Sequence, residues 1–246
     1  VMGGYLSSVR YVKGTAVYTT TFTPPTAPLT SISGTQLLTN FTNAGITDAT
    51  AKNDLETVGN AQISTGAAKF GSTSLKFDGN GDVLSVWSAP KLFNLGTGDF
   101  TLEMWINFTS TQSCHIFATN DGVGNDSPTG YFYFSYEGGS IYAAKGGGGA
   151  GNFISYAWTP TTGQWYHMAV SRTSSEMILF INGLKQPVST TGSPQTFNFV
   201  GDNHATIGVG VSSNYFDGYI QDLRLTKGYA RYVQPFTPPT QAFQLY

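Results

Sequence analysis

The chain has 246 residues, of which 11% are charged, 14% are aromatic and 30 are glycine, and its formal net charge is −2. The near-neutral charge, with no run of Lys and Arg, excludes the electrostatic footprint of a nucleic-acid-binding protein. The single cysteine, Cys114, excludes an intrachain disulfide, and no apolar run approaches the ~18 residues that a membrane-spanning helix needs.

Short aromatic and β-branched runs, separated by Gly, Pro, Asn and Asp, recur every ~8–12 residues and predict an all-β chain. The first predicted strand covers residues 5–11, and a second begins at Leu37, whereas the polar segment 47–60 is expected to be a loop. Further strands are predicted at residues 62–64, 74–77, 83–86, 100–108, 114–118, 131–136, 140–144, 153–157, 165–172, 177–181, 196–199, 205–209 and 216–226. This pattern is typical of two packed antiparallel sheets.

The segment 100–108, FTLEMWINF, alternates clearly between two faces. A period of two places its first, third and later odd members on one side of a strand, and we expect these to face the core: Phe100, Leu102, Met104, Ile106 and Phe108. The strand at 177–181 runs into Asn182-Gly183, the pair that a type I′ hairpin turn favours because both positions need a positive φ.

The two ends of the chain repeat each other. Residues 4–26 align without gaps to residues 218–240 at a constant offset of 214, and 12 of the 23 aligned positions are identical. The identical positions in the first copy are Gly4, Tyr5, Arg10, Lys13, Gly14, Ala16, Tyr18, Phe22, Thr23, Pro24, Pro25 and Thr26. Internal repetition of this kind changes which residues form one structural unit.

Six segments occur in an order that carries a family resemblance. They are SLKFDGNGDVLSV (74–86), GTGDFTLEMWINF (96–108), GQWYHMAVSR (163–172), MILFINGL (177–184), ATIGVG (205–210) and FDGYIQDLRLTKGYARY (216–232). Together they resemble the laminin G-like, concanavalin A-like jelly roll, of the type found in phage tail-fibre and virion structural proteins and in bacterial surface proteins. The resemblance covers residues 34–246 and implies an all-β, two-sheet antiparallel jelly-roll sandwich, a fold that hosts many functions.

The resemblance also bears on the terminal repeat, because in that family the repeated segment closes a unit. Residues 1–33 are therefore expected to be the closing strand and tail of a preceding repeat, or an inter-subunit arm, and residues 34–246 the laminin G-like domain. In a tandem array, the chain would be a fragment of a longer repeat protein or a protomer whose first strand completes a neighbour. Alternatively, the first copy lies on its own domain and protects a sheet edge from open pairing.

Catalytic residues are not predicted. The β-glucanases of this fold carry a Glu-x-Asp-x-x-Glu strand, since glycoside hydrolysis needs a pair of carboxyl groups, and the sequence contains no such triplet. Glu103, Glu137 and Glu176 are expected to be ordinary solvated carboxylates. No Gly-x-Ser-x-Gly elbow occurs, and His167, within an aromatic strand, is expected to be a hydrogen-bonded structural histidine.

The expected cofactor content is none, or one structural Ca²⁺. Calcium prefers several oxygen ligands from carboxylates and carbonyls on loops, and related domains hold Ca²⁺ near the sandwich edge. The candidate ligands are Asp48, Asp78 and Asp222. The alternative is that these aspartates only form turns.

A carbohydrate site needs exposed aromatic faces beside amide and carboxylate groups. Three Gly-rich or polar loops, at residues 119–130, 145–152 and 209–215, supply such groups near aromatic residues. The candidates for carbohydrate contacts are Tyr131, Tyr133, Trp158, Tyr215, Asn125 and Asp126. The alternative is that the aromatic members pack in the core or between the sheets.

These features lead to a functional hypothesis. The chain is expected to be a non-enzymatic structural or attachment module of a phage virion, as part of a tail fibre, spike or capsid decoration, that recognises a surface glycan. Its expected partners are other copies of itself or other virion proteins, contacted through residues 1–28, and cell-surface polysaccharide, without nucleic acid or membrane insertion. The expected location is the virion surface or the extracellular space. The alternative is a carbohydrate-binding, lectin-like module of a bacterial extracellular protein.

Overall fold

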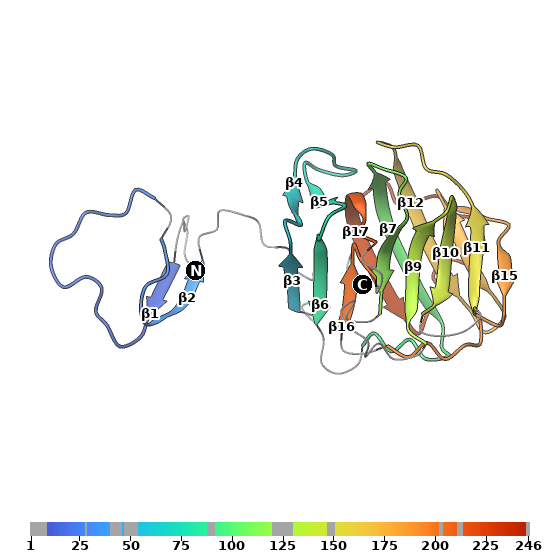
Figure 1. Cartoon of the computed structure of the whole chain (residues 1–246), viewed down its shortest axis with the longest axis horizontal. Helices are drawn as coiled ribbons and strands as arrows, with labels where there is room; N and C mark the ends of the chain where they lie inside the picture. The colour runs from blue at the N-terminus through green and yellow to red at the C-terminus, as the bar shows by residue number, and fades with distance from the viewer. Residues whose placement is uncertain are drawn as a thin grey trace. The chain divides into compact units, whose positions relative to one another are not determined.

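The computed structural model describes residues 9–27, 29–39, 46, 54–87, 92–119, 130–146, 151–201, 204–210 and 214–244. It divides the chain into two compact units, residues 1–46 and residues 47–246, whose strands are labelled in Figure 1. All regular structure in the described ranges is β-strand. Across those ranges, no helix is long and apolar enough to cross a membrane.

The first unit contains a two-stranded antiparallel sheet. Strand β1 (Val9–Val12) pairs with β2 (Thr35–Thr39), so that Arg10 lies opposite Leu38. The compact division therefore falls after residue 46 rather than at the expected junction of residues 33 and 34, because β2 finds its hydrogen-bonding partner in β1. The idea that residues 1–33 close a preceding repeat remains a prediction.

The second unit is a sandwich of two antiparallel sheets, which confirms the predicted fold class. The eight-stranded sheet has the order β15 (Ser189–Thr191), β11 (Phe153–Ala157), β10 (Ser140–Lys145), β9 (Phe132–Glu137), β8 (Cys114–Ala118), β16 (His204–Ile207), β6 (Val83–Trp87) and β3 (Asp54–Val58). The seven-stranded sheet has the order β14 (Leu184–Lys185), β13 (Met177–Ile181), β12 (Trp165–Arg172), β7 (Phe100–Phe108), β17 (Asp217–Lys227), β5 (Ser74–Asp78) and β4 (Gln62–Ser64). In Figure 1 the strands of the eight-stranded sheet follow one another across the sandwich from β3 to β15.

Aromatic side chains fill the space between the sheets. On β7, Phe100 meets Phe132 of β9 at a ring-centroid distance of 5.1 Å, and Phe108 meets Tyr136 at 5.9 Å. All five predicted inward residues of β7 are buried, and Phe100 and Phe108 contact side chains of the opposite sheet, so the predicted core face of this strand is confirmed. Cys114 is also buried, as expected, and burial raises the pKa of its thiol to about 12.

Two local predictions are wrong. Within the segment expected to be a loop, β3 is a strand that pairs with β6 at the sheet edge, and its mainly exposed residues obscured the strand pattern. The segment 196–199 forms only one bridge, between Phe199 and Gly96. Its carbonyl at Phe197 instead accepts a hydrogen bond of 2.9 Å from the guanidinium of Arg172. The predicted hairpin turn is confirmed, with φ values of 51° at Asn182 and 77° at Gly183.

After β17 the chain crosses the outer face of the seven-stranded sheet, and we call residues 228–244 the tail. Tyr232 and Phe236 stack with centroids 3.7 Å apart and pack against Ala169, Ile178 and Phe180 of β12 and β13. The Phe236 amide donates to the carbonyl of Gly183 at 3.0 Å. The approach is close: a Cβ at position 183 would lie 1.9 Å from the Phe236 carbonyl oxygen, so the turn requires glycine there.

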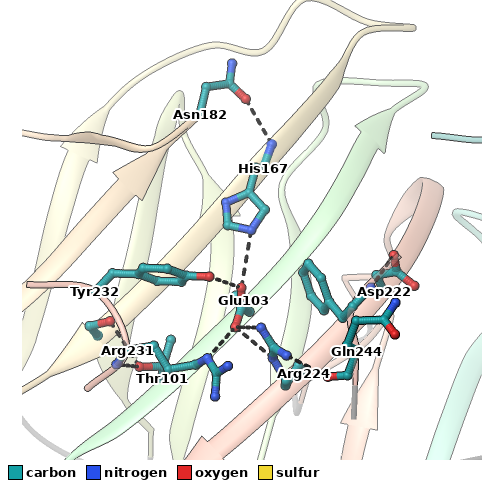
Figure 2. A network of polar contacts seen from close by, with 11 residues as sticks. Thr101, Glu103, His167, Asn182, Asp222, Arg224, Arg231, Tyr232 and Gln244 are labelled. Carbon is teal, nitrogen blue, oxygen red and sulfur yellow. Dashed lines mark hydrogen bonds and ion pairs between the residues drawn. The ribbon is translucent and has the colours of Figure 1, made fainter. Parts of the chain in front are cut away.

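The tail encloses Glu103, which projects from the outer face of β7 and is fully buried (Figure 2). Its Oε1 accepts hydrogen bonds from Arg224 Nε at 2.9 Å and Nη2 at 2.8 Å, and lies 3.4 Å from Arg231 Nε. Its Oε2 accepts from the Tyr232 hydroxyl at 2.8 Å and lies 3.4 Å from His167 Nε2. The expected solvated carboxylate at Glu103 is therefore wrong, because the tail covers this face, whereas the structural role expected for His167 is confirmed.

These contacts set the protonation of the cluster. Burial by itself would raise the pKa of Glu103, but the hydrogen bonds from His167 and Tyr232 and the charge of Arg224 outweigh it and hold that pKa below the ordinary value. Burial and the neighbouring carboxylate raise the pKa of Tyr232 to about 12. At neutral pH the cluster therefore holds an anionic Glu103 that accepts from a neutral phenol and from cationic guanidinium groups.

We expect Glu103→Gln to destabilise the fold because it leaves two arginines without a counter-ion. Removing one member of a buried ion pair typically costs ~3–5 kcal/mol, and we expect about 2–4 kcal/mol here, since the side chains of Arg224 and Arg231 keep 21% and 24% of their exposure. Guanidinium chloride unfolding measures the change. The matched control is Glu176→Gln, whose exposed 2.8 Å pair with Lys185 should contribute less than about 1 kcal/mol. Equal losses in the two variants would contradict the assigned role of Glu103.

The stabilisation by Glu103 should depend on pH. Its folded-state pKa lies below the ordinary value of 4.5, so its carboxylate stabilises the fold above that value and the stabilisation is lost as pH falls through the folded-state pKa. The difference in melting temperature between the unaltered chain and Glu103→Gln should be constant from neutral pH to about 5 and shrink below it. The difference between the two chains cancels the contribution of other titrating groups. One of these is Asp222, whose pKa is raised by burial. A difference that persists undiminished at strongly acidic pH would show that the carboxylate is not the source.

Candidate functional site

The outer face of the eight-stranded sheet carries a second set of aromatic side chains. On β9, Phe132, Phe134 and Tyr136 point into the core, so the alternate residues Tyr133, Ser135 and Glu137 face outward. Strand pairing extends this face to β10 and β11, where Tyr142 lies opposite Ser135 and Phe153 lies opposite Ala144. We call the following outward side chains the aromatic face: Trp87, His115, Tyr133, Glu137, Tyr142 and Phe153.

These side chains contact one another in pairs. The His115 ring stacks on Tyr133 with centroids 5.1 Å apart and planes 8° apart, and its Nε2 lies 3.2 Å from Glu137 Oε1. Tyr142 and Phe153, on neighbouring strands, meet edge to face at 5.7 Å. Both, like Tyr133 and Glu137, keep part of their surface exposed.

Trp87 is the more exposed end of the aromatic face. Its indole is 48% exposed and lies 4.2 Å from the ring of His204, whose Nε2 is 2.5 Å from the Ser85 hydroxyl. Register places Trp87 opposite both His204 of β16 and Asp54 of β3. An exposed indole plane here therefore lies beside a carboxylate-bearing position.

Electrostatics keep an anion and neutral phenols on this face. A hydrogen bond from His115, opposed by burial and assisted by Ser135, lowers the pKa of Glu137. Burial and the charge of Glu137 raise the pKa of Tyr133 to about 12. The arrangement can stack aromatic planes on the apolar C–H side of a sugar while carboxylate and hydroxyl groups bind its hydroxyls.

The structure brings together two of the predicted carbohydrate contacts. Tyr133 lies on the aromatic face, and Tyr131 is its neighbour at a centroid distance of 6.0 Å. Tyr131, however, is only 2% exposed, and a Cβ at Gly146 would lie 1.9 Å from its ring. Tyr131 is therefore covered by the neighbouring backbone at Gly146 and offers no plane to a ligand.

Of the other four candidates, the structure describes Trp158 and Tyr215. Trp158 packs edge to face on Tyr166 at 5.0 Å and on Phe108 at 6.1 Å, so its ring serves packing between the sheets. Tyr215 is partly exposed. It follows Asn214, whose carbonyl accepts a hydrogen bond from the amide of His115 at the start of β8. Asn125 and Asp126 lie outside the described residues.

Four members of the aromatic face were not predicted from the sequence: Trp87, His115, Glu137 and Phe153. Strand β9 carries aromatic residues on both faces, so hydrophobic alternation does not separate core from surface there. A usable signal was the outward pair Ser135 and Glu137, which are the polar members of that strand. The register of β8 to β11 assembles the face, and this register cannot be predicted from any single segment of the sequence.

The predicted calcium ligands are not brought together among the described residues. Asp78 Oδ1 accepts a hydrogen bond of 2.8 Å from the Asn80 amide, as in a turn. Asp222 has a φ of 55° and accepts from the Phe243 amide at 3.3 Å, and Asp48 lies outside the described residues. No group of three or more His, Cys, Asp or Glu side chains that could hold a metal occurs in the described part of the chain. A calcium site thus remains a prediction.

Comparisons with known proteins agree with this architecture. A family model described as the concanavalin A-like lectin/glucanases superfamily matches residues 78–230. No curated protein matches the sequence.

Solved structures with the same fold include two neurotoxin binding domains and one domain of an arabinanase. The botulinum neurotoxin serotype G binding domain aligns with a TM-score of 0.54 at 10% identity, covering 72% of this chain and 44% of that chain. The binding domain of botulinum neurotoxin DC, in complex with rat synaptotagmin II, aligns with a TM-score of 0.52 at 13% identity, covering 72% and 44%. Domain 4 of AbnA, a GH43 extracellular arabinanase from Geobacillus stearothermophilus, in complex with arabinotriose, aligns with a TM-score of 0.52 at 19% identity, covering 74% and 87%.

At these identities the structural similarity concerns the fold alone, and the chain spans less than half the length of the neurotoxin domains. The family match is broader evidence, because it runs from the end of β5 into the tail and covers more than half of the 246 residues. The chain belongs to the concanavalin A-like lectin/glucanase superfamily.

Proposed function

We propose that the chain is a non-enzymatic attachment module that binds a surface saccharide on the aromatic face. The observation that carries this proposal is the row of partly exposed aromatic planes beside the Glu137 carboxylate. Saccharide sites combine these two elements, since the planes cover apolar sugar faces and the polar groups fix orientation. The exposed indole of Trp87 extends the same face.

The similar structures support a saccharide ligand. The arabinanase domain was solved in complex with arabinotriose. A structure of botulinum neurotoxin type C aligns with a TM-score of 0.52 at 14% identity. Its description says that cell entry of this toxin depends on interaction with two ganglioside molecules. Both are separate proteins, and they favour the same ligand class for this fold.

The positions of the glutamates support a binding role without catalysis. Glycoside hydrolysis uses two carboxyl groups about 5–10 Å apart across the scissile bond. Glu103 is enclosed by its own arginine, tyrosine and histidine partners beneath the tail. On the aromatic face, Glu137 is held by His115.

The module is further proposed to sit at a virion surface, in a tail fibre, spike or capsid decoration, or in another extracellular assembly. Residues 1–28 would join it to other copies of itself or to other virion proteins. The repetition of the closing segment at the start of the chain supports such an assembly. The low charged content of 11% and the abundant glycine fit a rigid exterior part.

Binding should be tested on an array of immobilised oligosaccharides that includes arabinotriose. We expect saturable binding to at least one saccharide, weakened about tenfold, or ~1.4 kcal/mol, by Trp87→Ala or by Tyr142→Ala, because each change removes one stacking plane. Isothermal titration with the best saccharide measures the affinities, and product analysis after long incubation should recover that saccharide intact.

The matched control is Tyr229→Ala, which removes a tyrosine that is 61% exposed in the tail, away from the eight-stranded sheet. Its affinity should equal that of the unaltered chain. Binding that survives both aromatic-face changes, or that Tyr229→Ala weakens equally, would place the ligand elsewhere. The absence of saturable binding to any saccharide would refute the proposal.

A further inference from the structure

The N-terminal copy of the repeated segment has the same local conformation as the tail. Tyr18 and Phe22 stack with centroids 3.8 Å apart, and their counterparts Tyr232 and Phe236 stack at 3.7 Å. Gly14 in the first copy has a φ of 88°, and its counterpart Gly228 in the second has a φ of 85°. The sequence repeat is therefore also a structural repeat.

The correspondence continues beyond the identical residues. Arg10 donates from Nη1 to the carbonyl of Thr30 at 2.7 Å. Arg224, its counterpart, donates from Nη1 to the carbonyl of Gln244 at 3.2 Å, and residues 30 and 244 are again 214 apart. We call residues 9–30 the arm, the N-terminal equivalent of the end of β17 and the tail.

The arm differs from the tail in what it covers. Tyr232 and Phe236 are partly buried against β12 and β13, whereas Tyr18 and Phe22 are 47% and 49% exposed. Tyr11, which follows the repeated arginine, is 57% exposed. The arm thus presents to solvent the aromatic pair that the tail uses to grip a sheet.

A hollow of about 310 Å³ opens in the arm, at the position that corresponds to the Glu103 site of the tail. It is lined by Arg10, Tyr11, Val12, Thr15, Val17, Tyr18 and Leu29. The tail counterparts of four of these, Arg224, Arg231, Tyr232 and Phe243, surround the side chains of Glu103 and His167. The hollow is therefore lined by counterparts of the residues that surround a buried carboxylate and its histidine in the second unit.

The charge of the first unit points the same way. Residues 1–46 contain Arg10 and Lys13 but no Asp or Glu. Arg10 accordingly lacks, within its own unit, the carboxylate that Arg224 contacts. An acidic group from outside the unit would complete the site.

We propose that the arm docks on the outer face of a seven-stranded sheet in another sandwich of the same build, with a carboxylate equivalent to Glu103 beside Arg10. Arg224 lies opposite Glu103 in the β17–β7 pairing, so β1 would add to the corresponding strand by main-chain hydrogen bonds. Within the described residues, β1 pairs along one edge with β2 and along the other with no strand. The inference rests on the assembly part of the proposed function and names the surface that the partner supplies.

The partner's sheet lacks its own equivalent of the end of β17 and of the tail, since in this sandwich the end of β17 holds the place beside β7 that β1 would take. In this chain the tail already covers the outer face of the seven-stranded sheet. The arm has Val17 at the position that corresponds to Arg231, the tail residue that approaches Glu103. The arm is thus a weaker competitor for this face than the resident tail. Both observations fit a partner sandwich whose outer face is covered by an arm from another chain.

The first test exchanges one copy for the other in the full chain, by giving residues 228–244 the sequence of residues 14–30. The exchanged chain should fold with native near-ultraviolet circular dichroism and a melting temperature about 5–10 °C lower, because Arg231, which approaches Glu103, becomes valine and Phe243, which contacts His167, becomes leucine. Adding Glu103→Gln to it should lower the melting temperature again, since Arg224 is unchanged.

The matched control is the exchanged chain with Tyr232→Ser and Phe236→Ser, which keeps its charge but loses the stacked pair. This chain should melt at least 10 °C below the exchanged chain or fail to fold. An exchanged chain that does not fold, or that is no more stable than this control, would overturn the proposal.

The second test measures docking between two full-length chains. The acceptor carries Arg224→Gln, Tyr232→Ser and Phe236→Ser to release the end of β17 and the tail, and Arg10→Gln to disable its own arm. Sedimentation should show that the unaltered chain binds this acceptor and that an Arg10→Gln donor does not. A folded acceptor that binds neither donor would overturn docking in trans, and binding of both equally would exclude the carboxylate contact. Saccharide binding by Arg10→Gln should be unchanged, so failure here is distinguishable from failure of the proposed ligand.

Discussion

The buried carboxylate of Glu103 is the constraint on which the second unit depends. An ion removed from water costs several kcal/mol unless donors replace the solvent, and here Arg224, Arg231, Tyr232 and His167 do so. Three of these four come from the end of β17 and the tail, so the tail cannot shift along the sheet without leaving the charge unpaired. The contribution of the cluster is therefore mainly positional: it fixes one register of the tail on the sheet.

This anchoring gives the two outer faces of the sandwich different roles. On the seven-stranded sheet, Tyr232 and Phe236 turn an outward face into a second packed layer. On the eight-stranded sheet, the described outward aromatics of β9 to β11 keep part of their surface in solvent. One fold thus has an outer face that its own tail covers and a second outer face whose aromatic side chains form the proposed saccharide site. In the proposed assembly, the exposed arm, with the conformation of the tail, would cover the same face of another sandwich.

The sequence predicted what local patterns control. The alternation of Phe100–Phe108 predicted both the strand and its core face, and Asn182-Gly183 predicted the hairpin turn that follows β13. The burial of Glu103 could not be predicted in the same way, because its partner Arg224 lies 121 positions away. For the candidate site, composition pointed to Tyr133 but not to His115 or Glu137, since strand register brings these three together. The strand β3 was missed because an edge strand with exposed polar residues resembles a loop.

Native-state hydrogen exchange tests the anchoring of the tail most directly. The Phe236 amide donates to the Gly183 carbonyl at 3.0 Å, and the Arg231 amide donates to Thr101 Oγ1 at 2.8 Å. Our account predicts that both amides exchange as slowly as those of β12, and that Glu103→Gln accelerates both together while the amides of β9 stay protected. Exchange of the two amides at the rate of an unfolded peptide in the unaltered chain would contradict it.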